Sequence, residues 1–174
     1  MNLDLKEIYN DYLTEIESTN KLNYKKKNPN KYYRASAAGH CFKKHWYSIN
    51  GYEGTSTGTD RSKRLLRLGT IVHEDIQKAV ELYQSNNLPS KDEEVLFEEY
   101  NIKFETEYQI VIESLNIMGS ADIVLLDSEG TASVLDIKTT HSYKWKMMFG
   151  RNKDKSPSRM YELQLGTYAL GVCN

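Results

Sequence analysis

The spacing of hydrophobic residues changes twice along the chain, from helical to alternating and back to helical. Apolar side chains recur every three or four positions over residues 3–16 and again over residues 62–86, the spacing that collects them on one face of an α-helix. From about residue 104 to residue 139 apolar and polar residues alternate, which is typical of strands with one buried face. The helical spacing returns over residues 158–173. The pattern predicts helices, then a small sheet, then a closing helix.

Turn-forming sequences mark where these elements end. NPN at residues 28–30 predicts a break in the chain after the first helix of residues 3–16, and Ser36 is placed to cap a second helix that runs to about Asn50. NGYEGTSTGTD then predicts a loop, and NNLPS ends the long helix. Short turns separate three alternating segments, which predicts three consecutive antiparallel strands. The expected fold class is α/β, with a small central mixed sheet flanked by helices and an N-terminal helical extension.

Composition narrows the class of protein. At 174 residues and 39% hydrophobic, the chain is long enough for one domain with a buried core and too short for two to be expected. No apolar run approaches the length that spans a bilayer, and no signal peptide is recognisable. We therefore expect a cytoplasmic protein without a membrane partner, in a bacterium or, if the protein is viral, in the host cell. Cys41 and Cys173 are too few for a disulfide framework, so reduced thiols are expected.

Basic residues are concentrated although the net charge is only −1. Residues 21–46 hold eight lysines or arginines, no acid and five aromatic residues, whereas residues 92–107 hold seven acids. Cationic groups among aromatic rings suit phosphates and unpaired bases. The pattern favours a nucleic-acid-binding surface, and a solvated charged face is the alternative. The candidate binding residues are Lys25, Lys26, Lys27, Lys43 and Lys44.

Two acidic residues interrupt the apolar faces of the predicted strands. Asp122 is expected to share a face with Val124 and Leu126, and Asp136 and Lys138 are expected to share a face of the next strand. A buried carboxylate destabilises a fold unless it is paired, protonated or bound to a metal. Two carboxylates from adjacent strands would form an oxygen-rich site suited to Mg²⁺ or Mn²⁺. The alternative is an ion pair between Asp136 and Lys138 without chemistry.

Further polar residues extend this candidate site. The ammonium group of Lys138 would orient an attacking water and stabilise the charge that grows on a phosphate. His73, in LGTIVHE, lies at the margin of the apolar stripe of the long helix and is a candidate third ligand, although a core histidine is the alternative. Gly119, in GSAD, leaves room for a ligand's backbone. Gln164 and Tyr168 lie four residues apart on one face of the last helix.

LGTIVHE, GSAD, DIK and QLGTY follow one another in an order and at spacings that resemble the RecB-like, Cas4-like branch of the PD-(D/E)xK nuclease superfamily. The resemblance covers roughly residues 35–172, and the ordered set of four motifs is more specific than any one of them. It implies a restriction-endonuclease-like core in residues 35–174, preceded by an N-terminal helix and basic linker in residues 1–34.

The resemblance also implies a role for each matched residue. Four metal contacts are implied: the side chains of His73, Asp122 and Asp136 and the backbone carbonyl of Ile137. Lys138 would be the catalytic lysine. Gln164 and Tyr168 match the QxxxY motif, which in the family contacts and positions the nucleic acid. The implied protein is an Mg²⁺- or Mn²⁺-dependent DNA nuclease of exonuclease or end-processing type. It would act on DNA with free ends or single-stranded regions, in recombination, repair, phage replication or CRISPR-like processing.

Two features depart from the family pattern. HCFKKHWY resembles the segment that carries the first cysteine of an iron–sulfur cluster in Cas4-like members, but the three partner cysteines are missing and Cys173 follows Gln164 too closely to replace one. We therefore expect no iron–sulfur cluster from this chain alone. The sequence also ends directly after the QxxxY helix, where relatives usually continue, so a compact core or one completed by other residues is expected. A restriction-type endonuclease and an inactive DNA-binding module are the alternatives.

Overall fold

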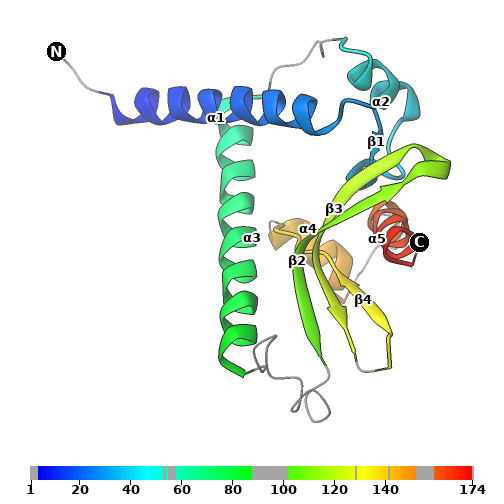
Figure 1. The fold of residues 1–174 in the computed structure, drawn as a ribbon. Helices are drawn as coiled ribbons and strands as arrows, with labels where there is room; N and C mark the ends of the chain where they lie inside the picture. Colours follow the sequence, from blue (N-terminus) through cyan, green and yellow to red (C-terminus); the bar gives the residue numbers. More distant parts are fainter. Residues whose placement is uncertain are drawn as a thin grey trace.

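The computed structural model describes residues 4–52, 54, 58–87, 102–127, 129–140, 142–151 and 159–173, which form an α/β fold with five α-helices and a mixed four-stranded sheet (Figure 1). The helices are α1 (Leu5–Lys27), α2 (Phe42–Ile49), α3 (Asp60–Asn87), α4 (Ser142–Phe149) and α5 (Arg159–Val172). The strands are β1 (Tyr33–Arg34), β2 (Lys103–Ile112), β3 (Ile117–Leu126) and β4 (Ala132–Leu135), with 3-10 turns η1 (Ala35–Ala37) and η2 (Glu113–Leu115). Within the described part of the chain, none of the helices combines the length and the apolar character needed to cross a lipid bilayer.

The two longest helices, α1 and α3, cross near the start of α3 (Figure 1). Hydrophobic spacing predicts that the first helix ends near residue 16, but α1 continues to Lys27. The added turns are rich in lysine and are supported by an ion pair of 2.7 Å between Glu17 and Lys21, one turn apart. The helix stops at Asn28, directly before Pro29, because the residue before a proline is disfavoured in helical conformation. Lys25, Lys26 and Lys27, which were expected in a basic linker, therefore form the last turn of a helix.

The sheet is organised around β3. β2 pairs with it antiparallel along its whole length, and β4 pairs antiparallel with its end, so the predicted run of three antiparallel strands is confirmed. β1, which the hydrophobic pattern does not predict, pairs parallel with the start of β3 on the same edge as β4. The middle of β3, from Gly119 to Asp122, has no strand partner on that edge among the described residues.

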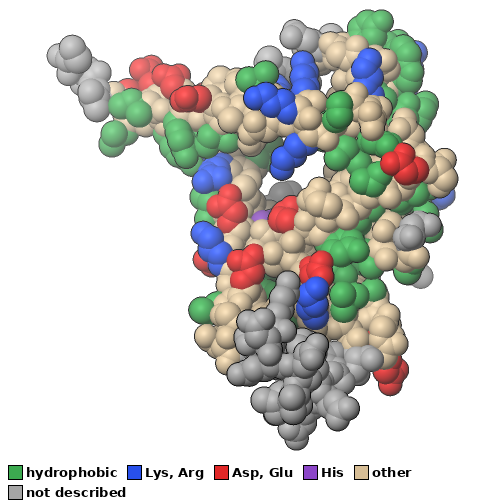
Figure 2. All heavy atoms as spheres, viewed as in Figure 1, with side chains coloured by type: hydrophobic (Ala, Val, Ile, Leu, Met, Phe, Trp, Pro, Cys, Tyr) green, Lys and Arg blue, Asp and Glu red, His purple; other side chains and the backbone are tan. Residues whose placement is uncertain are grey.

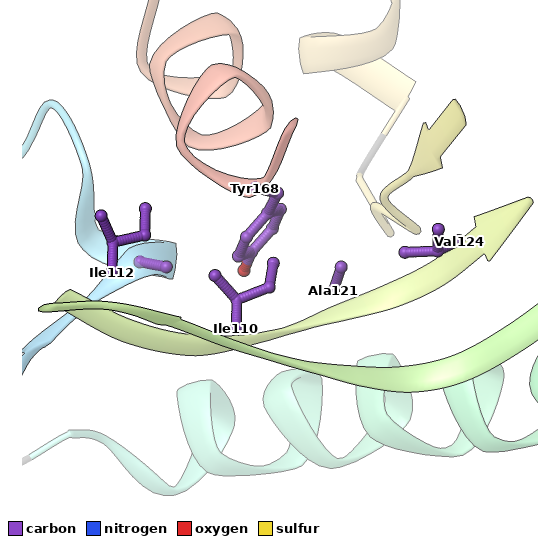
Figure 3. Close-up of a cluster of buried hydrophobic side chains, with 6 residues drawn as sticks. Ile110, Ile112, Ala121, Val124 and Tyr168 are labelled. Atoms are coloured by element: carbon purple, nitrogen blue, oxygen red, sulfur yellow. The ribbon is translucent and has the colours of Figure 1, made fainter. Parts of the chain in front are cut away.

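α5 covers one face of the sheet and α3 lies against the other (Figure 3). The core beneath α5 consists of Ala35, Ile110, Ile112, Ala121, Val124 and Tyr168. Ala121 and Val124 lie three residues apart in β3, and in a regular strand such residues point to opposite faces. The alternation therefore breaks between them, at Asp122. Because Asp122 contacts His73 of α3 while Val124 packs under α5, the prediction that Asp122 and Val124 share a face is wrong.

The segment that leads into α2 corrects two further expectations. Ser36 lies in η1 and caps no helix; α2 begins at Phe42, after Cys41 as its N-cap. A Cβ at Gly119 would lie only 2.6 Å from the Cβ of Ala35. The space left by the missing side chain of Gly119 is thus filled by η1, and the expectation that it serves a ligand's backbone is wrong. Gly119 allows η1 to pack closely on β3.

Candidate active site

The ladder between β3 and β4 stops one residue short of two carboxylates. Its last pair is Ile123 with Leu135, and the same register continued by one residue would set Asp122 opposite Asp136. β4 ends instead at Leu135, and the N–H of Ile137 donates to Oδ2 of Asp122 at 2.7 Å. The two carboxylates predicted on adjacent strands therefore meet where β3 and β4 separate. We call this place the strand junction. Asp136 was predicted to lie within the strand, but β4 ends at Leu135 and Asp136 follows it.

Asp122 carries a largely buried carboxylate beside the imidazole of His73. Its side chain is only 16% exposed, and its Oδ2 lies 3.5 Å from Nδ1 of His73. Burial raises the pKa of Asp122 above its ordinary value, and the nearby charge of Asp136 adds to the rise. The N–H of Ile137, His73 and Lys138 act in the opposite direction. A cation bound at this carboxylate would relieve the same penalty.

Asp136 is held from two sides. Its side chain is 5% exposed, and both of its oxygens contact Nζ of Lys138, at 2.7 and 2.8 Å. Nε2 of Gln164 donates to Oδ1 of Asp136 at 3.1 Å and to the hydroxyl of Tyr168 at 3.0 Å. The Asp136–Lys138 ion pair, expected as one of two alternatives, is therefore present, and the contact is compatible with both.

Gln164 and Tyr168 lie inside the protein, with exposures of 7% and 3%. Burial raises the pKa of the Tyr168 hydroxyl, and the carboxylates of Asp136, Asp122 and Glu107 add to the rise, opposed by the hydrogen bond from Gln164. Gln164, which was predicted to contact nucleic acid together with Tyr168, thus holds Asp136 from inside the protein, and its amide also donates to Tyr168. Their position supports an indirect role, through the orientation of that carboxylate.

Two residues that the sequence did not single out also border the junction. Nε2 of Gln77 donates to the backbone carbonyl of Asp122 at 3.3 Å and to Oε1 of Glu107 at 2.9 Å. Glu107 occupies the position opposite Asp122 in the β2–β3 register, and it has a φ of 50°. Its other oxygen accepts a hydrogen bond from Ser120. The spacing of Gln77 four residues after His73 on α3 was the available signal, whereas the position of Glu107 depends on the strand register.

The donor chemistry of the junction fits the predicted ions. Carboxylate and carbonyl oxygens with one imidazole suit Mn²⁺ and, where oxygen dominates, Mg²⁺. Among the described residues, however, no group of three or more histidine, cysteine, aspartate or glutamate side chains is gathered closely enough to hold a metal ion. In this geometry the Lys138 ammonium is the cation on Asp136. The predicted ligands therefore lie around one junction without forming a closed coordination shell.

The predicted binding lysines lie away from the junction, at the last turn of α1 and in α2, and all are exposed: Lys25, Lys26, Lys27, Lys43 and Lys44. Figure 2 shows lysine and arginine side chains gathered over the C-terminal half of α1 and over α2. Below them the surface is hollowed between α1, α3 and the sheet, and a histidine and acidic side chains are visible at the lower edge of this hollow (Figure 2).

The two cysteines also lie apart from the junction. Cys41 is the N-cap of α2 and Cys173 follows α5, and both are free and exposed. The expectation that this chain carries no iron–sulfur cluster stays a prediction. Iron analysis of anaerobically purified protein tests it, because a cluster would give stoichiometric iron and a brown colour.

Comparisons of the chain with family models, with curated proteins and with solved structures find no match in any of the three. Residues of all four motifs lie at the strand junction: His73 contacts Asp122, Asp122 accepts from the N–H of Ile137, and the neighbouring Asp136 accepts from Gln164.

Proposed function

We propose that this chain is a divalent-metal-dependent DNA nuclease with a restriction-endonuclease-like core. The observation that carries the proposal is the strand junction, where Asp122 and Asp136 meet with the ammonium of Lys138 on Asp136 and the imidazole of His73 on Asp122. Carboxylates, an imidazole and a lysine at one place are the groups that metal-assisted phosphodiester hydrolysis needs. The proposal places the protein in the cytoplasm with DNA as its partner.

In this proposal one set of residues binds the metal ion and Lys138 acts on the reacting groups. His73, Asp122, Asp136 and the carbonyl of Ile137 would hold Mg²⁺ or Mn²⁺. The ion would supply Lewis acidity and activate water for attack on the phosphodiester. Lys138, whose ammonium contacts Asp136, would orient the attacking water and stabilise the negative charge that develops on the phosphate.

Residues around the junction would keep this geometry. Gln164, supported by Tyr168, fixes one oxygen of Asp136. Gln77 fixes the backbone of Asp122 from α3. Such outer contacts orient ligating groups and tune their affinity for a metal. We propose an exonuclease or end-processing enzyme, acting in recombination, repair, phage replication or CRISPR-like processing; a restriction-type endonuclease is the nearest alternative.

A second candidate function is a DNA-binding module without activity. The closed Asp136–Lys138 ion pair favours it, because a lysine held by both oxygens of a carboxylate can be purely structural. In that case a divalent ion would neither displace the lysine nor change the stability of the protein. The two candidates therefore predict different responses to Mn²⁺.

A digestion panel tests the proposal. Linear and circular DNA, each single- and double-stranded, is incubated with the protein and Mg²⁺, Mn²⁺ or EDTA. We expect cleavage of linear DNA with a divalent ion and none in EDTA. Asp136→Asn should abolish cleavage, whereas Asp127→Asn, in the β3–β4 turn, should not, because its backbone hydrogen bonds can be kept. Cleavage of closed circles would identify an endonuclease.

A melting experiment adds a measurement that does not depend on activity. A ligand that binds only the folded state raises the midpoint of unfolding. Mn²⁺ should therefore raise the Tm of the wild type and of Asp127→Asn, and raise that of Asp136→Asn less or not at all. Cleavage that persists in EDTA, or an Asp136→Asn protein with the wild-type rate, would overturn the proposal. Wild-type protein with no cleavage and no Mn²⁺ shift would favour the binding module.

A further inference from the structure

Three exposed aromatic side chains are packed together at the end of α2. Trp46 and Tyr52 are stacked with their ring centroids 6.1 Å apart, and Tyr47 meets each of them edge-on, at 5.2 and 5.1 Å. Their exposures are 42% for Trp46, 40% for Tyr47 and 60% for Tyr52. Aromatic rings that contact one another in this way usually lie in a core or an interface. We call these three residues the aromatic platform.

The local structure holds the platform in one shape. α2 ends in a Schellman motif, in which the N–H of Gly51 donates to the carbonyl of Ser48 and the N–H of Tyr52 donates to that of Tyr47. Gly51 has a φ of 84°, which glycine adopts without strain. The motif turns the chain back and sets the ring of Tyr52 against that of Tyr47. The platform is thus ordered before any partner binds.

The platform adjoins the basic part of the chain: Trp46 is the last residue of the stretch 21–46, and Tyr47 and Tyr52 follow it. Nζ of Lys43 lies 5.9 Å from the ring centre of Tyr47, and Lys44 is exposed on the same helix. The imidazole of His45 has a pKa below its ordinary value, mainly through burial and further through the positive charges of His40, Lys44 and Arg34. Residues 21–46 contain no acid. Although Glu53 directly follows Tyr52 in the sequence, the α2 side of the rings, with Lys43 and Lys44, therefore attracts anions.

The charge decides which partner fits. An apolar protein segment could cover the rings, but it would have to be strongly acidic as well to match the lysines. A nucleic-acid duplex would satisfy the lysines but leave the rings unused, because its base faces are covered by stacking. Single-stranded DNA offers phosphates and open base faces together, and base–aromatic stacking is how proteins bind it without regard to sequence.

We propose that the aromatic platform binds unpaired bases of single-stranded DNA, so that the protein engages a frayed or single-stranded end. The choice of DNA as the ligand rests on the proposed function, whereas the preference for unpaired bases rests on the platform itself. The platform is connected to the junction through the fold: η1, which leads into α2, packs against α5, and α5 carries Gln164 and Tyr168. A DNA strand bound to the platform would therefore contact a part of the fold that packs directly on the helix of Gln164 and Tyr168.

Tryptophan fluorescence measures this contact directly, because the chain has two tryptophans, Trp46 and Trp145. In Trp145→Phe, Trp46 is the sole tryptophan. Its emission should be quenched by oligothymidylate of about 20 nucleotides, which exceeds the site sizes usual for such proteins, and much less by a duplex at equal phosphate concentration. The titration is done in EDTA so that no cleavage occurs.

The matched control is Trp46→Phe, which leaves Trp145. Trp145 is also an exposed aromatic on a short helix, 56% exposed and 4.4 Å from Phe149, and its emission should not respond. In binding assays Trp46→Ala should weaken the affinity for oligothymidylate roughly tenfold or more, whereas Trp145→Ala should leave it unchanged. Circular dichroism melts establish that each variant is folded; the quenching result does not depend on any change at Trp46.

Several outcomes would overturn the inference. Equal quenching by duplex and single strand would mean that only the backbone is bound near Trp46. No quenching by either, with unchanged affinity of Trp46→Ala, would exclude the platform as a DNA site. A dimer in size-exclusion chromatography that Trp46→Ala dissociates would identify a protein interface. The two proposals fail separately: quenching without any cleavage would reject the nuclease, and cleavage without quenching would reject the platform.

Discussion

Asp122 carries a carboxylate that the fold keeps largely from water. Because burial raises its pKa in the folded protein, the charged form is less favourable there than in the unfolded chain, where the pKa is about 3.9. The contribution of Asp122 to the stability of the folded state is therefore present below the unfolded pKa and is lost as the pH rises through the folded one. At the residue scale, this is the energetic penalty that a bound cation would reduce.

Asp122→Asn removes this penalty without a metal present. The carboxamide oxygen can still accept from the N–H of Ile137, so the variant should be more stable than the wild type at pH 7 in EDTA. The difference should disappear below about pH 4, where the carboxyl of the unfolded chain is protonated too. Urea unfolding at both pH values measures it. Equal stability at pH 7 would show that the buried charge is already compensated within the protein.

Substitution of Lys138 separates an effect on the cleavage rate from an effect on DNA affinity. We expect Lys138→Ala to reduce the cleavage rate by roughly 10²- to 10³-fold, the range for loss of one group that stabilises transition-state charge, with little change in DNA affinity. Lys78→Ala, which removes an exposed lysine of α3, is the control and should keep the wild-type rate. An equal loss of affinity and rate in Lys138→Ala would assign this lysine to the binding surface.

At the scale of single elements, the end of α2 shows how a local motif builds a surface. The Schellman hydrogen bonds of Gly51 and Tyr52 need a residue with positive φ between the helix and the returning chain. The same bonds bring two aromatic rings together. The aromatic platform should therefore depend on a residue that contributes no side chain to it.

Gly51→Ala should destabilise this turn by about 1 kcal/mol, because an alanine at φ 84° is strained although no atom lies within 4 Å of the added Cβ. Binding of single-stranded DNA should weaken along with it. Gly54→Ala is the matched control, since Gly54 also has open space and no positive φ. Denaturant unfolding and the oligothymidylate titration measure the two effects. Gly51→Ala with wild-type values in both would mean that the platform does not need the Schellman turn.

At the scale of the whole molecule, charge is divided between two regions. Lysines and arginines gather over the C-terminal half of α1 and over α2, and acidic side chains lie at the lower edge of the hollow in the same face (Figure 2). Reversing the charge of Lys25, Lys26 and Lys27 together should weaken DNA binding and make its salt dependence shallower, because fewer counterions are released. The cleavage rate at saturating DNA should change little. An unchanged salt slope would show that the last turn of α1 is not a phosphate contact.

The sequence alone determined the parts of this protein that depend on neighbours in the chain. The helical spacing of residues 62–86 predicted α3, and the alternating segments predicted β2, β3 and β4. Asp122 and Asp136 were expected to meet because consecutive antiparallel strands are adjacent. All of these follow from local preferences and short connections.

The tertiary structure alone decided which side chains share the strand junction. The break in the alternation of β3 turns Asp122 toward α3, and the β2–β3 register puts Glu107 opposite it. The packing of α5 directs Gln164 toward Asp136 and buries the Gln164 side chain. The four-residue spacing of Gln164 and Tyr168 predicted only that they share a face of the helix. Register and helix docking are set by long-range packing of the core, since a shift of one residue exchanges the faces of a strand. The sequence thus determined the elements and their chemical groups, and only the packing of α3 and α5 on opposite faces of the sheet decided how those groups meet.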